Sequence, residues 1–187
     1  MSASHPLARI PSNRRGVVFV VLLLATLLIM ATFQVTSSEM STPAAPQAIV
    51  SFELAGTVVQ AQAIIDSWGT LARLQAAFGL GLDYLYMPVY STTIALACVW
   101  VADGLRRRSA FASAVGVALA WGLWLAALLD ATENAALLTM LLAGVASPWP
   151  QVASWCAAVK FALILAGIGY ALAGVIGLLV ARSVRKG

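Results

Sequence analysis

Apolar residues divide the chain into four long hydrophobic segments joined by polar connections. Residues 17–33 contain no charged side chain, and three further segments cover about residues 84–102, 110–134 and 152–181. A run of roughly 20 apolar residues can cross the hydrocarbon core of a bilayer as a helix. The third segment is expected to continue as helix to about residue 145. This pattern predicts an all-α protein, a four-helix transmembrane bundle.

Residues 34–82 form the one long connection, and its second half is amphipathic. Its beginning is rich in serine and proline, which is typical of a flexible linker. Thr57 is a suitable N-cap and Gly69 a suitable end for a helix between them. The apolar residues of that region recur at helical spacing, at Leu54, Val58, Ala61, Ile64, Ile65 and Trp68.

Two further features of this connection lead to expectations. Residues 50–54 alternate between apolar and polar side chains but have no partner strand, so they are expected to be extended or coil. A second short helix is expected over about residues 70–78, ended by Gly79 and Gly81. Together these helices should form a short cap on the outer side. The cap would cover the apolar residues at the end of the third segment, Leu137, Leu138, Leu141 and Leu142.

The composition excludes an ordinary soluble domain. The 187 residues are 61% hydrophobic and 10% charged, whereas soluble domains are roughly 45–50% apolar and about 25% charged. We therefore expect residues 1–187 to form a single integral membrane domain. A cleaved signal peptide is the alternative for residues 17–33, but no A-x-A pattern follows Phe33, so the first span is expected to be retained.

Basic residues predict the orientation, because cytoplasmic loops next to spans retain Lys and Arg. Four crossings bring three basic clusters to one side: Arg9, Arg14 and Arg15; Arg106, Arg107 and Arg108; Arg182, Arg185 and Lys186. Six of the seven acidic residues fall on the other side or at its edge. We expect a multi-pass protein of the cell (inner) membrane with both termini in the cytoplasm. The net charge of +4 is explained by this distribution, so no nucleic-acid partner is expected.

Several kinds of chemistry lack their usual residues. The only histidine, His5, lies in the polar leader, so a histidine-ligated haem, a zincin site and a Ser-His-Asp triad are not expected. Cys98 and Cys156 lie in different apolar segments and are not expected to form a disulfide. We therefore expect no cofactor, no metal site and no catalytic residue of a known motif.

A group of polar residues near the outer edge of the spans is the one candidate site. Counting about 1.5 Å per helical residue from the inner arginines places Asp83, Asp130 and Lys160 at a similar depth. The spacing i, i+3, i+4 puts Asp130, Glu133 and Asn134 on one helix face. Asp83 similarly shares a face with Tyr86 and Tyr90. The candidate polar cluster is Asp83, Tyr86, Asp130, Glu133, Asn134 and Lys160.

Three interpretations of Lys160 stay open. An ionisable residue in a span usually faces a bundle interior, so Lys160 would pair with Asp130 or Glu133. Alternatively, Lys160 snorkels outward and the acids only mark the water boundary. In the third interpretation the cluster is a substrate or proton site.

Small and aromatic residues inside the spans indicate helix packing. Gly169, Ala173 and Gly177 lie at four-residue spacing in the fourth span, and Gly116 and Ala120 do so in the third. Such residues let helices approach closely. We expect packing within the monomer, with a homo-oligomer as the alternative. Trp121 and Trp124 are interpreted as lipid-facing or packing residues.

Three strings of residues resemble those of an uncharacterised family of small bacterial four-span integral membrane proteins. They are FELAG (52–56), LDYLYMPVY (82–90) and LLDATEN (128–134). The resemblance implies a shared fold and names no activity.

Two functions are therefore expected as alternatives. The first is a non-enzymatic membrane module that binds a lipid or a partner protein at its outer side. The second is a membrane-embedded enzyme or proton-linked carrier that uses the polar cluster for acid–base chemistry on a small molecule. No internal repeat is visible, which disfavours a carrier.

Overall fold

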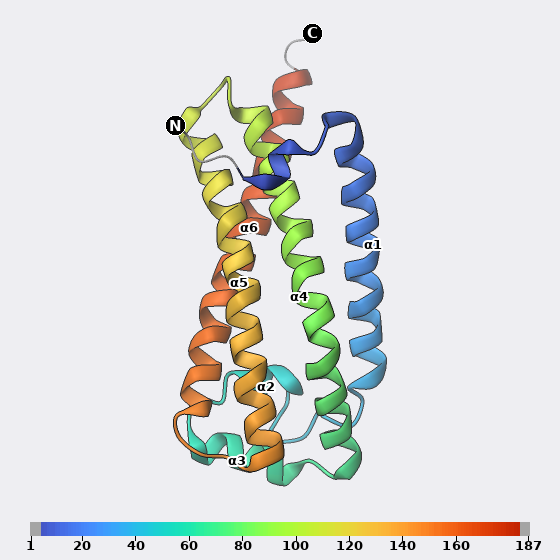
Figure 1. Ribbon diagram of the computed structural model, residues 1–187, viewed down its shortest axis with the longest axis vertical. Coiled ribbons are helices and arrows are strands. Elements are labelled where there is room, and N and C mark those ends of the chain that lie inside the picture. The colour runs from blue at the N-terminus through green and yellow to red at the C-terminus, as the bar shows by residue number, and fades with distance from the viewer. Residues whose placement is uncertain (1–4, 184–187) are drawn as a thin grey trace.

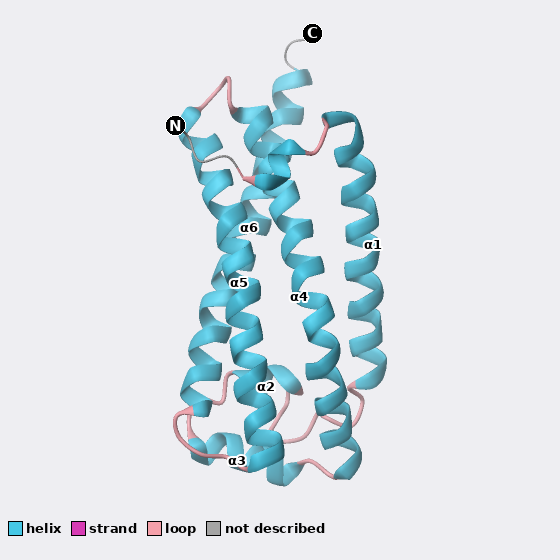
Figure 2. Cartoon of the chain, in the orientation of Figure 1, coloured by secondary structure: helices cyan, strands magenta, loops and turns pink. Residues whose placement is uncertain are grey.

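The structure is a computed structural model that describes residues 5–183, the side chain of residue 182 excepted, and within that range every regular element is a helix (Figures 1 and 2). The elements are η1 (Pro6–Arg9), α1 (Ser12–Thr36), α2 (Ile49–Glu53), α3 (Val58–Ser67), α4 (Thr70–Leu105), α5 (Ala110–Ala143) and α6 (Trp149–Ser183). The prediction of an all-α bundle is confirmed. Arg185 and Lys186 of the C-terminal basic cluster lie outside the described residues.

Four helices, α1, α4, α5 and α6, are long and apolar enough to cross a membrane, so the chain is a multi-pass membrane protein. α4, α5 and α6 contain 36, 34 and 35 residues. At about 1.5 Å per residue each exceeds roughly 50 Å, against a hydrocarbon core of about 30 Å. These three helices therefore project beyond the bilayer, whereas α1 has only 25 residues.

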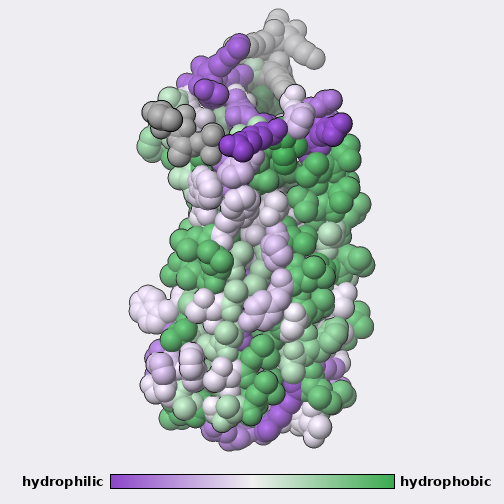
Figure 3. Space-filling model, viewed as in Figure 1, coloured by the Kyte–Doolittle hydropathy of each residue, from purple (hydrophilic) through white to green (hydrophobic). Residues whose placement is uncertain are grey.

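α4 is the central helix of the bundle. It packs against α5 and α6, and α1 stands at the edge of the molecule beside α4 (Figure 1). On the face shown in Figure 3, hydrophobic side chains predominate along the flanks of the bundle, and strongly hydrophilic ones gather at its two ends, most densely at the end where both termini lie. This distribution is the one that a bilayer around the middle of the bundle requires.

Glycines allow the close packing of α5 and α6. A Cβ on Gly116 would meet the ring of Tyr170, whose hydroxyl donates a 2.9 Å hydrogen bond to the carbonyl of Ala112. A Cβ on Gly174 would meet Val101 of α4. Gly116 and Ala120 are thus buried inside the monomer, as expected.

The expectation that Gly169, Ala173 and Gly177 also pack within the monomer is wrong. No neighbouring part of the described chain lies within 4 Å of a Cβ built on Gly169 or Gly177, and Ala173 is exposed. α6 is rotated so that Gly167 and Gly174 face its neighbours instead. Four-residue spacing predicts that small residues share a face but does not say which way that face points.

The residues before α1 fold back onto the bundle. The His5 ring packs on Trp121 and Trp124, with ring centroids 4.7 and 4.4 Å away. Arg15 fixes this segment, because its guanidinium donates to the carbonyls of Ile10 (2.9 Å) and Ala8 (2.8 Å) and pairs with Asp103 of α4. The two tryptophans therefore have a packing role, and burial lowers the pKa of His5.

Residues 37–69 cover the end of the bundle opposite the termini and form the cap (Figure 1). The rings of Phe52 and Trp68 are 5.4 Å apart, and the Trp68 indole donates to the carbonyl of Met40 at 2.9 Å. Their cluster includes apolar residues from α4, α5 and α6: Ala72, Ala76, Leu80, Ala136, Leu137, Met140 and Ala153. The cap thus buries Leu137 and partly buries Leu138 and Leu141, while Leu142 stays exposed.

Two local predictions in this region are wrong. Residues 49–53 form the short helix α2 instead of extended chain, and Phe52 of this helix is fully buried in the cap cluster. Five alternating residues are too few to distinguish a strand from a short helix. Residues 70–78 are not a separate helix either, since α4 runs unbroken through Gly79 and Gly81. A Gly in a helix costs only about 1 kcal/mol relative to Ala, and the buried stripe of α4 continues across both glycines.

Candidate functional site

Lys160 of α6 lies at the centre of a buried group of carboxylates. Its Nζ is 2.7 Å from Oδ1 of Asp130 and 3.0 and 2.9 Å from the two oxygens of Glu133. The exposed fractions are 4% for Lys160, 3% for Asp130 and 0% for Glu133. Lys160 therefore does not snorkel to the surface, and both carboxylates that were weighed as its partner contact it.

Asp130 joins α5 to both neighbouring helices. Its Oδ2 accepts a 2.9 Å hydrogen bond from the hydroxyl of Tyr90 on α4, while Oδ1 faces Lys160 on α6. One turn further along α5, the Asn134 amide donates to the carbonyl of Leu80 (3.1 Å) and to Oδ2 of Asp83 (2.9 Å). The i, i+3, i+4 spacing thus directs three polar side chains of α5 to the junction of α4, α5 and α6.

Tyr86 lies beside the cluster and not in it. Its ring packs on Tyr90 at 4.9 Å and on Phe33 of α1 at 5.4 Å. Tyr90, one turn deeper on the same face, makes the hydrogen bond to Asp130 instead. Their shared face was visible in the sequence, but the depth at which α4 meets Asp130 depends on how the two helices are aligned.

Glu53 is the member of the site that the sequence did not reveal. It ends α2 in the cap, is largely buried, and places Oε2 3.8 Å from Nζ of Lys160. The expectation of extended chain or coil at residues 50–54 gave Glu53 no role in the site. Burial raises the pKa of Glu53, and the positive charge of Lys160 only partly opposes this. The one sequence feature that could have pointed to Glu53 is its position between two large apolar residues in a short amphipathic segment.

The polar atoms of the cluster are incompletely paired. Oε2 of Glu53, Oε2 of Glu133 and Oδ1 of Asn134 are buried and accept no hydrogen bond from the described residues. Oε2 of Glu133 lies near Nζ, but only Oε1 has hydrogen-bonding geometry. One ammonium group therefore faces three carboxyl groups, and Asp83 adds a fourth behind Asn134.

The cluster lies near the edge of the hydrocarbon on the side of the cap. Asp130 is about 33 Å along α5 from Arg108, and the hydrocarbon core is about 30 Å thick. Further into the membrane, the hydroxyls of Thr26 and Thr93 are hydrogen-bonded at 3.1 Å. Beyond them the described core is apolar and contains Ala95, Cys98, Val99, Ala120 and Leu123.

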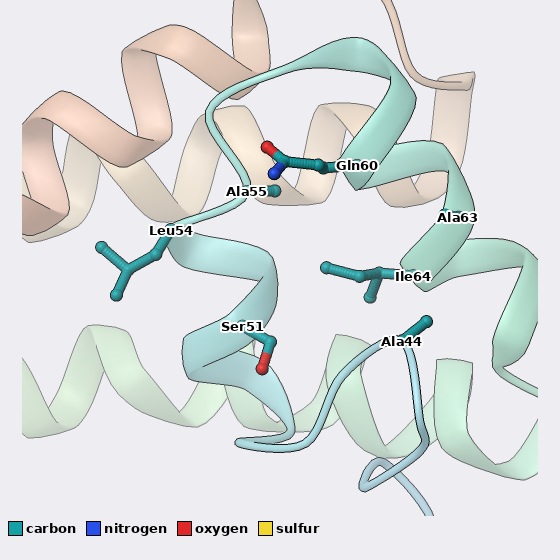
Figure 4. Close-up of a pocket in the computed structure, with 7 residues that line it drawn as sticks. All are labelled: Ala44, Ser51, Leu54, Ala55, Gln60, Ala63 and Ile64. Atoms are coloured by element: carbon teal, nitrogen blue, oxygen red, sulfur yellow. The ribbon is translucent and has the colours of Figure 1, made fainter.

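The cap has a shallow hollow of about 250 Å³ between α2, α3 and the preceding loop. Figure 4 shows Ile64 and Ser51 facing each other across it, with Gln60 at one side. The hollow is lined by Ala44, Ser51, Leu54, Ala55, Gln60, Ala63 and Ile64. Small apolar side chains with two polar groups at the edge suit one inserted side chain or the end of an acyl chain.

Among residues 5–183 no group of three or more His, Cys, Asp or Glu side chains is arranged to hold a metal ion. The resemblance carried by residues 52–56, 82–90 and 128–134 stays a prediction. Comparison of the chain with protein-family models, curated proteins and solved structures gives no match.

Proposed function

We propose that this protein is a non-enzymatic membrane module that binds a lipid or a partner protein through its cap. The observation that carries the proposal is the coverage of the polar cluster. Glu133 is fully buried and Lys160 nearly so beneath the cap. A substrate would reach these groups only if the cap moved, whereas the hollow on the cap is open at the surface.

The cap is well suited to act as a binding surface because it is attached firmly. Phe52 and Trp68 anchor it in an apolar cluster with α4, α5 and α6, and Glu53 reaches Lys160. Arg73 of α4 adds hydrogen bonds to the carbonyls of Trp68 (3.1 Å) and Ile65 (2.8 Å). Binding to a pre-ordered surface avoids the entropy loss of ordering a loop.

The proposal includes the location of the cap. Arg9, Arg14 and residues 106–108 lie at the end opposite the cap, and positive residues favour the cytoplasmic side. We therefore place the protein in the cell (inner) membrane with both termini in the cytoplasm. The cap and its hollow then face the outer side.

Filling the hollow tests the proposal. Ala63→Trp should block it, while Gln62→Trp on the adjacent exposed position of α3, outside the lining, is the matched control. The readouts are lipid retained on protein released from native membranes, by mass spectrometry, and crosslinking to a partner from a photoreactive residue at Gln60. We expect lipid retention or crosslinking to fall about tenfold or more in Ala63→Trp only, and a tenfold fall is equivalent to about 1.4 kcal/mol of binding free energy. Equal retention and equal crosslinking in both variants contradict the proposal.

A second candidate, an enzyme or proton-linked carrier, is favoured by the hydrogen-bonded series Tyr90, Asp130 and Lys160. Proton transfer needs such groups within hydrogen-bond reach. The apolar layer beyond Thr93 disfavours a carrier, because a proton path across the membrane needs polar groups or water. Reconstituted liposomes with an internal pH dye test the carrier: proton flux that is lost in Asp130→Asn supports it, and flux equal to that of empty liposomes contradicts it.

A further inference from the structure

The buried cluster contains more acid than base. Glu53, Asp130 and Glu133 converge on the single ammonium group of Lys160, and Asp83 lies behind Asn134 as a fourth acid. If every carboxyl were ionised, the cluster would have a large net negative charge. Charge in a buried site that lacks a counter-charge is strongly disfavoured, and carboxyls in such sites retain protons.

The contacts identify which carboxyl holds the charge that balances Lys160. Asp130 accepts hydrogen bonds from two donors, the Tyr90 hydroxyl and the Lys160 ammonium. Hydrogen bonds and a nearby cation favour the ionised form. Asp130 and Lys160 are therefore assigned as the neutral ion pair. Glu53 and Glu133, each with an unpartnered buried oxygen, are left without a second cation.

Apart from Lys160, the described elements around Glu53 contain mainly acidic titratable groups. α3 contains one titratable residue, Asp66, which is exposed and accepts a hydrogen bond from Gln62 at 2.8 Å. α6 contributes Lys160 and the half-buried thiol of Cys156. α5 contributes Asp130 and Glu133, and α4 contributes Asp83, Tyr86 and Tyr90. Among these described residues only Lys160 is positively charged. Arg73 of α4, which also contacts the cap, donates to the carbonyls of Trp68 and Ile65 instead.

We infer that the cluster is a proton-binding site in which at least one exchangeable proton is held by the Glu53 and Glu133 pair while the cap is docked. This inference is independent of what the cap binds. A proton is the counter-charge that needs no additional space in a packed site. The raised pKa of Glu53, caused by its burial, agrees with this assignment.

Cap docking is then linked to pH, because Glu53 belongs to the cap. When the cap leaves the bundle, Glu53 enters water and ionises with the ordinary pKa of about 4.3. The docked state binds more protons, so a rise in pH favours the undocked state. Between the undocked and the docked pKa values, one linked proton changes the ratio of undocked to docked molecules about tenfold per pH unit.

Two measurements test the inference. Infrared spectra at neutral pH should contain the carbonyl stretch of a protonated carboxyl, and Glu53→Gln should remove one such proton whichever member of the pair holds it. Asp66→Asn, at an exposed acid of α3, is the matched control and should leave the band unchanged. The second measurement follows the cap by maleimide labelling of Ala45→Cys, which is buried, relative to Ala44→Cys, which is exposed.

Labelling is compared from neutral to alkaline pH in a background of Cys98→Ala and Cys156→Ala. The ratio of the two rates cancels the pH dependence of thiol reactivity. We expect the ratio to rise with pH when Glu53 is present and to stay constant in Glu53→Gln. An infrared spectrum without a protonated carboxyl, or a ratio that does not change with pH in the protein that retains Glu53, overturns the inference. Both of these results are decisive even if Glu53→Gln does not fold.

Discussion

At the scale of single residues, Lys160 contacts both of the acids that the sequence left as alternative partners. Its Nζ lies within 3.0 Å of both Asp130 and Glu133. The depth of these residues and the shared face of the two acids were predictable from spacing. The rotation of α6 toward them was not, because it depends on packing against Leu123 and Val101 through Gly167 and Gly174.

Replacing Lys160 by methionine should destabilise the protein by leaving buried carboxylates without a counter-charge. Removing one side of a buried ion pair typically costs about 3–5 kcal/mol. Unfolding in detergent should show a decrease in this range for Lys160→Met. Arg107→Met, at an exposed cation, should change the unfolding free energy by less than about 0.5 kcal/mol.

Because two acids contact Lys160, adding Asp130→Asn to Lys160→Met should recover only part of this loss. Adding Glu133→Gln as well should recover more. Unchanged stability in Lys160→Met would mean that the pair is absent or solvated in the membrane protein.

At the scale of elements, the face that each long helix presents to its neighbours is selected by small residues. Gly116 and Gly169 are both helical glycines, but a Cβ meets the Tyr170 ring at the first and open space at the second. In both helices the small residues recur at four-residue spacing, so the spacing does not distinguish the two positions. The two positions therefore provide a matched pair for measuring helix contact.

Gly116→Ala should destabilise the protein by about 1–3 kcal/mol, the usual range for overpacking. Gly169→Ala should be neutral or stabilise by up to about 1 kcal/mol, because Ala has the higher helix propensity. Thermal unfolding in detergent measures both. Equal effects at the two positions would contradict the packing of α5 on α6 described above.

The N-terminal segment is held by a single side chain of α1. Arg15 contacts the carbonyls of Ala8 and Ile10 and also Asp103. Arg15→Lys keeps the charge but has no planar fork, so it should lose at least one of these bonds, each worth about 1.5–3 kcal/mol. Amide hydrogen exchange should then increase in residues 5–10 and stay unchanged in α3. No increase would indicate that packing of His5 on the tryptophans holds the segment alone.

At the scale of the whole molecule, three helices are longer than the bilayer and end in a helical cap on one side, while the arginine clusters at residues 9–15 and 106–108 lie on the other. The lengths of the helices and the positions of the arginine clusters therefore indicate the same arrangement, in which the cap and the termini lie on opposite sides of the membrane. The direction of that arrangement is open to a direct test.

Single cysteines should report opposite sides of the membrane. In a Cys156→Ala background, Ser41→Cys in the cap should react with an impermeant maleimide in intact cells. Ser183→Cys should react only after the cytoplasmic side is opened, because positive residues flank that end. Both positions are exposed, so access to the reagent differs only by side. Labelling of Ser183→Cys in intact cells would contradict the proposed orientation.

Four spans, the helical cap and the two polar ends were determined by the sequence, because each depends on the length, periodicity or charge of a continuous segment. The positions of Asp83, Asp130 and Lys160 along their helices followed in the same way. The tertiary structure alone decided the helix at residues 49–53, the unbroken course of α4, the outward direction of Gly169 and the approach of Glu53 to Lys160. These features depend on how helices rotate and pack against residues distant in the chain, and the free energy of that packing overrides local preferences of about 1 kcal/mol.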